Sequence, residues 1–221
     1  FDIINYVDEF VIYDDVQYTR RDGRNRKKIK TENGTKWLTI PIEVKGKYLQ
    51  PIKDTKVIDF NWVKKHWKTI SHYYKKAKFF NEFEEIFQSN YQSIQSKYLT
   101  EINYKFINLI CRILDIETKI SFSMDFELNE LNQTEKLISL CEEVNADIYL
   151  TGPTAKGYLD EDLFNECSIR VEWMDYSKYK QYRQLFPPFN HEVSIIDLIF
   201  NEGNKSKEYL ISNQEGRSKI I

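Results

Sequence analysis

A concentration of positive charge follows two acidic residues near the start of the chain. Asp14 and Asp15 end a short apolar run, and seven of the eleven residues from 20 to 30 are Arg or Lys. These cations repel one another unless an anion or nearby carboxylates offset them. Guanidinium groups grip phosphate through paired hydrogen bonds, and lysine adds a point charge. The segment therefore predicts a site for an anionic small molecule such as a nucleotide or nucleotide-linked sugar, with a solvated basic loop as the open alternative.

The acidic pair allows two roles. Asp14 or Asp15 could act as a general base or bind a metal ion, and the alternative is that both pair with the arginines. The cofactor is left open, with magnesium as the candidate, because the spacing of His and Cys residues predicts no metal site. The substrate-binding residues expected in this region are Gln17, Tyr18, Arg20, Arg24, Asn25, Arg26 and Lys28.

A second motif runs from Thr151 to Asp160, between a predicted strand and a predicted helix. Its glycines allow backbone N–H groups to approach a ligand closely, and the following helix N-terminus favours negative charge. It is not a Walker motif, because no Gly-Lys-Ser/Thr follows. The residues expected to contact substrate are Thr151, Gly152, Tyr158 and Asp160. A plain strand-to-helix turn is the alternative.

A third motif is an apolar helix from Ser194 that ends at Gly203. It carries Asp197 among Ile and Leu residues, so this carboxylate is either a buried, paired group or a site residue with a raised pKa. Asn201 lies one turn further along and is a candidate substrate contact. His191, just before the helix, is a candidate proton carrier, although a lone loop histidine is more often idle.

The elements that must position these motifs follow from hydrophobic periodicity. Short β-prone runs predict strands at 10–13, 37–40, 120–124, 148–151 and 169–173. A helical insert is expected at about 60–115, including one long helical face from Ile94 to Ile113 and an aromatic part whose rings form its core. Asn132 and Glu135 form a potential capping box. Alternating strands and helices predict parallel pairing, so the fold class is α/β, a single domain with a parallel-sheet, Rossmann-like core.

Composition limits the classes of function. The 221 residues are 41% apolar and 30% charged, which is typical of a globular domain. A formal net charge of −2 argues against a nucleic-acid partner. Cys111, Cys141 and Cys167 match no disulfide framework, so we expect a cytoplasmic protein, and no apolar run is long enough to span a membrane.

Several ordered segments resemble the WbqC-like protein family. They are 14–18 (DDVQY), Asn25-Arg26, 37–41 (WLTIP), 149–153 (YLTGP), 158–160 (YLD) and 194–201 (SIIDLIFN). The resemblance covers about residues 1–203 and implies a role in surface-polysaccharide or O-antigen biosynthesis, with a nucleotide-linked sugar as substrate. It also implies a short apolar strand and loop before Phe1.

Three hypotheses follow. The first is a transferase that attaches an acyl or aminoacyl group to a nucleotide-linked amino sugar. The second is a nucleotidylyl transferase or ATP-dependent ligase, by analogy with the HIGH-type entry to a nucleotide site, with Asp14 and Asp15 binding magnesium. The third is a non-enzymatic assembly factor that uses the aromatic helices as a contact surface, which requires Trp62, Trp67 and Phe83 to be exposed. The oligomeric state is left open.

Overall fold

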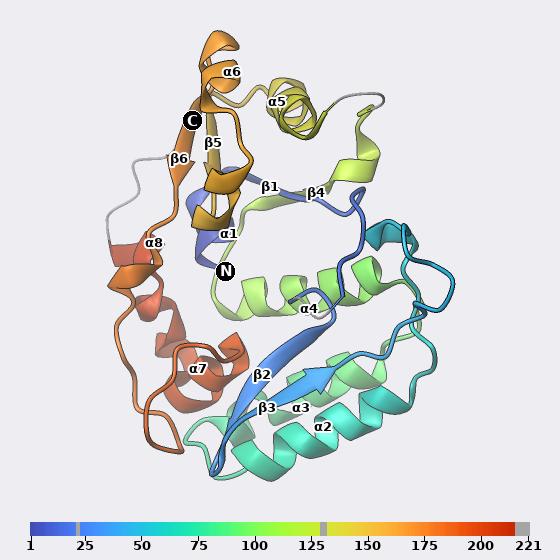
Figure 1. Cartoon of the computed structure of the whole chain (residues 1–221). Helices are drawn as coiled ribbons and strands as arrows, with labels where there is room; N and C mark the ends of the chain where they lie inside the picture. Colours follow the sequence, from blue (N-terminus) through green and yellow to red (C-terminus); the bar gives the residue numbers. More distant parts are fainter. Residues whose placement is uncertain (21–22, 129–131, 215–221) are drawn as a thin grey trace. The chain divides into compact units, whose positions relative to one another are not determined.

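The structure, a computed structural model, describes residues 1–20, 23–128 and 132–214, and it divides the chain into two compact units (Figure 1). Unit 1 contains Phe1–Asp14, Ile116–Tyr179 and the described residues from Glu208 onward. Unit 2 contains Asp15–Asp115 and Lys180–Lys207, except for the two residues that are not described. The expectation of a single domain concerns independent folding, which this division does not test, and it stays a prediction.

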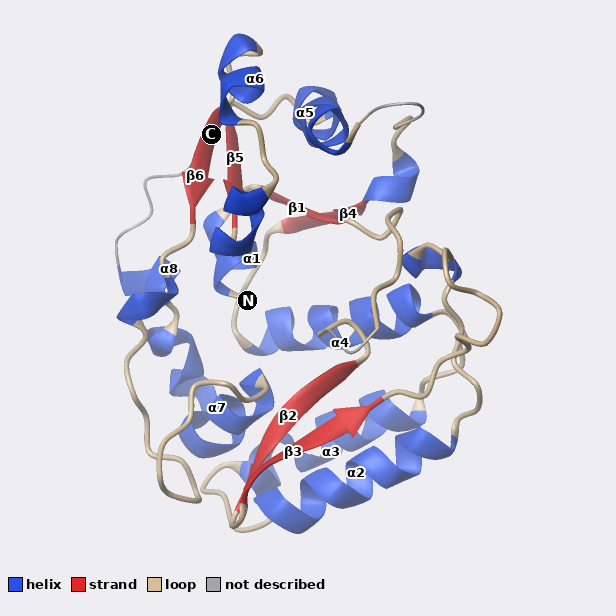
Figure 2. Ribbon diagram, viewed as in Figure 1, coloured by secondary structure: helices blue, strands red, loops and turns tan. Residues whose placement is uncertain are grey.

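Unit 1 is built around two parallel strand pairs (Figure 2). Strand β1 pairs with β4 so that Phe10 lies opposite Ile120, and β5 pairs with β6 so that Tyr149 lies opposite Val171. The predicted parallel pairing is therefore confirmed for these strands. The elements of unit 1 are α1 (Asp2–Tyr6), β1 (Glu9–Ile12), β4 (Lys119–Phe122), α5 (Gln133–Glu143), β5 (Ile148–Thr151), α6 (Glu161–Glu166), β6 (Arg170–Trp173) and α8 (Ile211–Gln214).

The helices of unit 1 begin as the sequence indicates. The side chain of Asn132 accepts a hydrogen bond from the backbone N–H of Glu135, and the Glu135 carboxylate accepts one from the N–H of Asn132, which confirms the capping box of α5. This helix and α6 then contribute apolar side chains to one core. That core consists of Leu137, Ile138, Cys141, Phe164 and Ile169.

Unit 2 contains a β-hairpin packed on helices. Strands β2 (Arg26–Thr31) and β3 (Gly34–Thr39) pair antiparallel, with Lys28 opposite Trp37, so the basic segment is an arm of a hairpin. Gly34 makes the turn with φ = 104°, a conformation that favours glycine. Ile29 points from β2 into the core and is fully buried. The helices of unit 2 are α2 (Asn61–Tyr74), α3 (Phe80–Gln92), α4 (Leu99–Ile113) and α7 (Ile195–Glu202).

Aromatic rings fill the core between these helices. Phe200 on α7 lies 5.1–5.3 Å, between ring centroids, from the rings of Tyr74, Phe80 and Phe87. Trp62 and Phe83 are buried and Trp67 is half-buried, which confirms that the aromatic residues mainly form a core. These rings therefore do not offer the open surface that the assembly-factor hypothesis requires.

The predicted long helical face from Ile94 to Ile113 is wrong at its beginning. Helix α4 starts at Leu99, and the residues before it are extended. The backbone N–H of Leu99 donates to the carbonyl of Thr55, and that of Val57 donates to the carbonyl of Lys97. This pairing with 55–57 competes with helix formation and leaves Tyr98 exposed, so Ile94 and Tyr98 continue the spacing of α4 without belonging to it.

In its coarse class the fold mixes helices with small sheets, as the sequence predicts. Within the described residues, none of the helices combines the length and the apolar character that crossing a bilayer demands.

Candidate functional site

The cationic face of the hairpin is the strongest candidate site, and it lies entirely in unit 2. Residues 26, 28 and 37 share one face, because side chains alternate along a strand. The guanidinium carbon of Arg26 lies 4.2 Å from the ring centroid of Trp37, and Nζ of Lys28 lies 5.3 Å from it. The indole is 45% exposed. We call these three residues the cationic face; it presents an accessible aromatic ring with two cations beside it.

Part of segment 189–194 lies next to this face. Lys28 forms a 2.7 Å ion pair with Glu192, and the backbone N–H of Ser194 donates to the carbonyl of Lys28. The hydrogen bond and charge of Lys28 lower the pKa of the Glu192 carboxyl. His191 is exposed and its ring packs edge-on against Phe189, with centroids 4.5 Å apart. Lys28, a predicted substrate-binding residue, thus contacts Glu192, the residue that follows His191. The assignment of His191 as a proton carrier stays a prediction.

Residues 15–18 of the DDVQY segment belong to unit 2 and do not form an open loop. We call them the strap, because they are hydrogen-bonded along another segment of unit 2. The Asp15 carboxylate forms a 2.6 Å ion pair with Lys53. The backbone N–H of Ile52 donates to the carbonyl of Val16, and the backbone N–H of Tyr18 donates to the carbonyl of Gln50. Residues 15–18 are therefore bonded along residues 50–53. Gln17 donates its side-chain amide to the carbonyl of Tyr48. The ion pair resembles the expected pairing of an aspartate with a cation, but the cation is Lys53.

Tyr18 and Asn25 close the strap onto the hairpin. The Tyr18 hydroxyl donates to Oδ1 of Asn25 at 2.9 Å, and Nδ2 of Asn25 donates to the carbonyl of Ile40. Both side chains are buried. Their bonds hold residues that flank the hairpin, so a role in positioning explains them, while direct contact with substrate stays a prediction.

Two further arginines lie outside the cationic face and are exposed. Nη2 of Arg20 donates to the carbonyl of Val44, and its guanidinium lies 5.3 Å from the Tyr48 ring centroid. Nη1 of Arg24 donates to the hydroxyl of Thr19. The sequence places both in one basic cluster with Arg26, whereas the structure gives each a different neighbour. Arg21, which belongs to the same run, is outside the described residues.

Asp197 is the centre of a buried polar network. Its carboxylate is fully buried and accepts hydrogen bonds from the hydroxyls of Tyr74 at 2.8 Å and Tyr182 at 2.7 Å. Nδ2 of Asn201 donates to the carbonyl of Asp197 and, at 3.4 Å, to its Oδ1. Burial raises the pKa of Asp197, and the hydrogen bonds from both tyrosines counteract that rise. Of the two alternatives for Asp197, the structure shows the buried, paired carboxylate, and its contact with a substrate stays a prediction.

The network continues to β2 and to segment 184–190. The Tyr74 hydroxyl accepts from the backbone N–H of Lys30, whose buried ammonium donates to the carbonyl of Pro188. Gln184 donates to the carbonyl of Asn190 and accepts from its N–H, at 2.8 Å each. Buried polar groups of this kind are costly unless satisfied. Here they fasten segment 184–190 to the hairpin and α7, and so hold the residues that precede Glu192.

The remaining predicted residues lie in unit 1. Asp14 is buried; its Oδ1 accepts from the Ser123 hydroxyl at 3.2 Å, and its N–H donates to that same hydroxyl oxygen. Thr151 ends β5, and a short 3-10 helix (Pro153–Gly157) follows Gly152. Asp160 caps α6 by accepting from the N–H of Leu163, as expected of a strand-to-helix turn.

The end of the second motif borders an open hollow of about 510 Å³. Tyr158 and Asp160 line it together with Lys156, Glu161 and Asp162, so acidic side chains outnumber the single cation. Nζ of Lys156 lies 5.1 Å from the Trp173 ring centroid. The hollow is a less favourable place for an anion than the cationic face, and substrate contact by these residues stays a prediction.

Metal chemistry receives no structural support from side-chain clustering. Among residues 1–20, 23–128 and 132–214, no group of three or more His, Cys, Asp or Glu side chains is arranged to hold a metal ion.

In the cationic face, the residue that sequence reasoning missed is Trp37. Its signal was available: a hairpin with a turn at 32–34 places Trp37 opposite Lys28 once the register is known.

The chain belongs to the WbqC-like protein family, which matches residues 1–209. It is 43% identical over 210 residues to the "Uncharacterized protein Rv1507c" of Mycobacterium tuberculosis, an alignment that covers 95% of this chain and 90% of that protein. No solved structure matches the chain. Family membership confirms the resemblance seen in the sequence.

Proposed function

We propose that the cationic face binds the base and diphosphate of a nucleotide-linked sugar. The observation that carries the proposal is the placement of Arg26 and Lys28 at an exposed Trp37 ring. An aromatic face stacks on a nucleobase, and the paired N–H groups of a guanidinium suit a diphosphate. A single-stranded nucleic acid would use the same contacts, but the net charge of −2 disfavours a polyanion.

The reaction we propose is transfer of an acyl or aminoacyl group to the amino group of that sugar, in cytoplasmic surface-polysaccharide biosynthesis. The amine attacks the thioester carbonyl of an acyl-CoA donor, a C–N bond forms, and the C–S bond breaks as the thiolate of CoA leaves. The amine must also lose a proton, for which His191 is the candidate base, because it is exposed and adjoins Glu192 at the edge of the cationic face. Asp15 is less suited, since Lys53 already pairs with its carboxylate. A Rossmann-like organisation of unit 1 is part of this proposal and is supported by its two parallel strand pairs.

A thermal-shift screen tests the proposal. The ligands are nucleotides, nucleotide sugars and acyl-CoAs, each with and without magnesium. A ligand at about 100 times its dissociation constant adds about 2.7 kcal/mol to the free energy of unfolding. We expect a nucleotide-sugar shift in the wild type that Arg26→Ala removes.

Lys36→Ala is the matched control. Lys36 belongs to the same hairpin but points to the opposite face, where Nζ lies 5.6 Å from the Tyr73 ring centroid. Its removal should leave the ligand shift intact. A shift seen only with ATP and magnesium would support the ligase hypothesis instead. No shift with any ligand would count against the proposal.

A further inference from the structure

A loop tip in unit 2, residues 44–49, exposes apolar side chains that no part of the cationic face requires. Leu49 is 80% exposed and Tyr48 is 68% exposed, more than any other large apolar side chain of the described residues. The two residues are consecutive at a turn, and the Tyr48 ring centroid lies 5.3 Å from the Arg20 guanidinium carbon. Exposed apolar groups that gather in this way commonly mark a contact surface.

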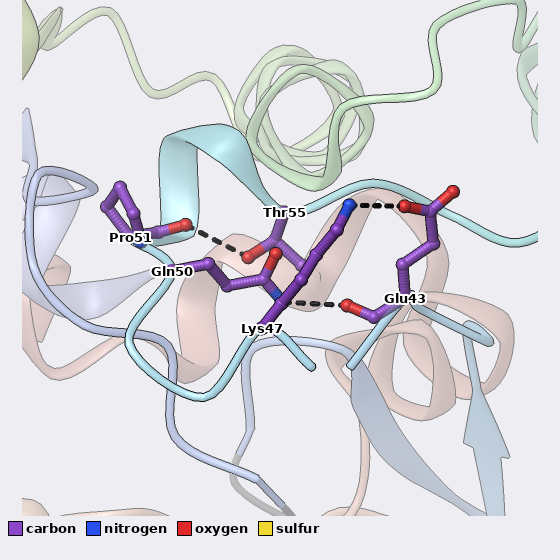
Figure 3. Close-up of polar contacts among 5 residues, drawn as sticks. All are labelled: Glu43, Lys47, Gln50, Pro51 and Thr55. Atoms are coloured by element: carbon purple, nitrogen blue, oxygen red, sulfur yellow. Dashed lines mark hydrogen bonds and ion pairs between the residues drawn. The ribbon is translucent and has the colours of Figure 1, made fainter. Parts of the chain in front are cut away.

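The loop that carries this tip is internally braced, so the exposure does not arise from an unstructured segment (Figure 3). Lys47 pairs with the Glu43 carboxylate at 2.5 Å, and Nε2 of Gln50 donates to the carbonyl of Glu43 at 2.7 Å. The Thr55 hydroxyl donates to the carbonyl of Pro51. The first two bonds join residues 47 and 50 to Glu43 across the loop, and the third holds the residues that directly follow it.

Lysines lie in and near the same tip. Lys45 and Lys47 lie within it, and Lys47 pairs with the Glu43 carboxylate. Lys56 and Lys97 are close enough to Glu43 to contribute, after Lys47, to lowering the pKa of its carboxyl. The tip therefore combines two exposed apolar side chains with several lysines.

We propose that the 44–49 tip docks on a bilayer surface that contains anionic lipid. Leucine enters the boundary of the acyl chains, tyrosine lies at the level of the headgroups, and lysines contact the lipid phosphates. A protein partner fits less well, because a specific protein interface buries about 800 Å² on each side and a tip with two apolar side chains offers much less. Such docking would place the protein at a membrane without any spanning segment.

Co-sedimentation with lipid vesicles tests this proposal. One set of vesicles contains phosphatidylcholine and phosphatidylglycerol, and the other contains phosphatidylcholine alone. We expect the wild type to pellet with the mixed vesicles and to be released by salt. Lys45→Ser should weaken the partition constant about fivefold, and Leu49→Ser by about tenfold or more.

Matched controls are Lys64→Ser on α2 and Ile86→Ser on α3, both exposed residues away from the loop. They should bind vesicles as the wild type does. As a second measurement, the emission of a Leu49→Trp variant should shift to shorter wavelength when mixed vesicles are added. Thermal unfolding of each variant checks that it is folded.

Two results would overturn the proposal. One is failure of the folded wild type to pellet with mixed vesicles. The other is binding that Leu49→Ser leaves unchanged and that soluble poly-glutamate matches in strength, because this would identify a purely electrostatic surface for an acidic polymer. Since neither Lys45 nor Leu49 belongs to the cationic face, either result leaves the proposed ligand site untouched.

Discussion

The two halves of strand β2 contrast sharply although each contains lysine. In the first half, Arg26 and Lys28 flank an exposed Trp37, and Lys28 pairs with the exposed Glu192. In the second half, Lys30 is buried and joined to the network of Tyr74 and Asp197. Lys28 and Lys30 share a residue type and a strand face. Burial distinguishes the two lysines: Lys30 is a buried structural group, whereas Lys28 is partly exposed and pairs with Glu192.

The largest expected effect on stability is at the buried network that joins Lys30, Tyr74 and Asp197. Asp197→Ala removes the acceptor of two tyrosine hydroxyls in a buried site, so we expect the free energy of unfolding to fall by about 3–5 kcal/mol in urea titrations. Glu85→Ala is the control, since Glu85 is an exposed carboxylate on α3. It should unfold near the wild-type midpoint. Equal stability of Asp197→Ala and wild type would mean that the network does not stabilise unit 2.

A second effect concerns pH and compares a buried with an exposed histidine. Burial lowers the pKa of His66 from 6.5 to about 4, and its Nε2 lies 3.0 Å from the carbonyl of Thr39 on β3. As pH falls from 6.5 to 4, the unfolded chain takes up a proton that the folded protein does not bind. The free energy of unfolding should therefore fall by about 3 kcal/mol across this window.

His66→Gln removes this contribution, so its stability should change less with pH than that of the wild type over the same range. His191→Gln, in contrast, should keep the wild-type dependence, because His191 is exposed. Urea titrations at several pH values measure both slopes. Parallel curves for His66→Gln and wild type would contradict the inference that His66 is held neutral by burial.

A smaller effect is expected from a single hydroxyl of the network. Tyr182→Phe leaves Asp197 with one hydrogen bond fewer and removes the acceptor of the 3.3 Å bond from Gln184, so we expect a loss of about 1–3 kcal/mol of stability. Tyr48→Phe is the comparison, because Tyr48 is largely exposed, and its stability should stay near that of the wild type. A neutral Tyr182→Phe would limit the network to Tyr74 and Asn201.

The smallest effect on stability is expected in the exposed first half of β2. Lys28→Ala should leave the unfolding midpoint nearly unchanged, since exposed ion pairs stabilise little. It should nevertheless weaken binding of a nucleoside diphosphate about fivefold at low ionic strength, and less at high salt, because one cation near the phosphates is lost. Titration calorimetry at two salt concentrations measures this. Unchanged affinity at low salt would exclude Lys28 from the site.

Much of this contrast could not be predicted from the sequence. Hydrophobic periodicity located β5 at 148–151 and the α7 helix with Asp197 and its Gly203 end correctly, because those signals are local. The run of cations gives no sign that Lys30 is buried while Lys28 is not. Segment 184–190, which is far away along the chain, contributes to that difference, because the carbonyl of Pro188 accepts a hydrogen bond from the Lys30 ammonium.

Contacts between residues far apart in the sequence also explain where the structure differs from the sequence-based predictions at α4 and at Asp15. The spacing before α4 is helical, yet residues 97–99 pair with 55–57, and no local signal at Tyr98 indicates this. One of the two alternatives for Asp15 was pairing with a nearby arginine, and the structure shows an ion pair with Lys53, which is far enough along the chain that no local signal indicates it. The fold therefore places the predicted cations in exposed and buried positions that the sequence does not distinguish, and their role in binding a substrate stays a prediction.

Calorimetric titration of the wild type, Arg26→Ala and Lys36→Ala with the nucleoside diphosphates UDP, GDP, CDP and ADP tests the proposed site most directly. We predict that at least one binds the wild type, that Arg26→Ala weakens it about tenfold or more by removing charge-assisted hydrogen bonds, and that Lys36→Ala stays within about twofold of the wild type. Equal affinity of Arg26→Ala and wild type, or no binding of any nucleoside diphosphate by the folded wild type, would contradict the assignment of the cationic face as a nucleotide site.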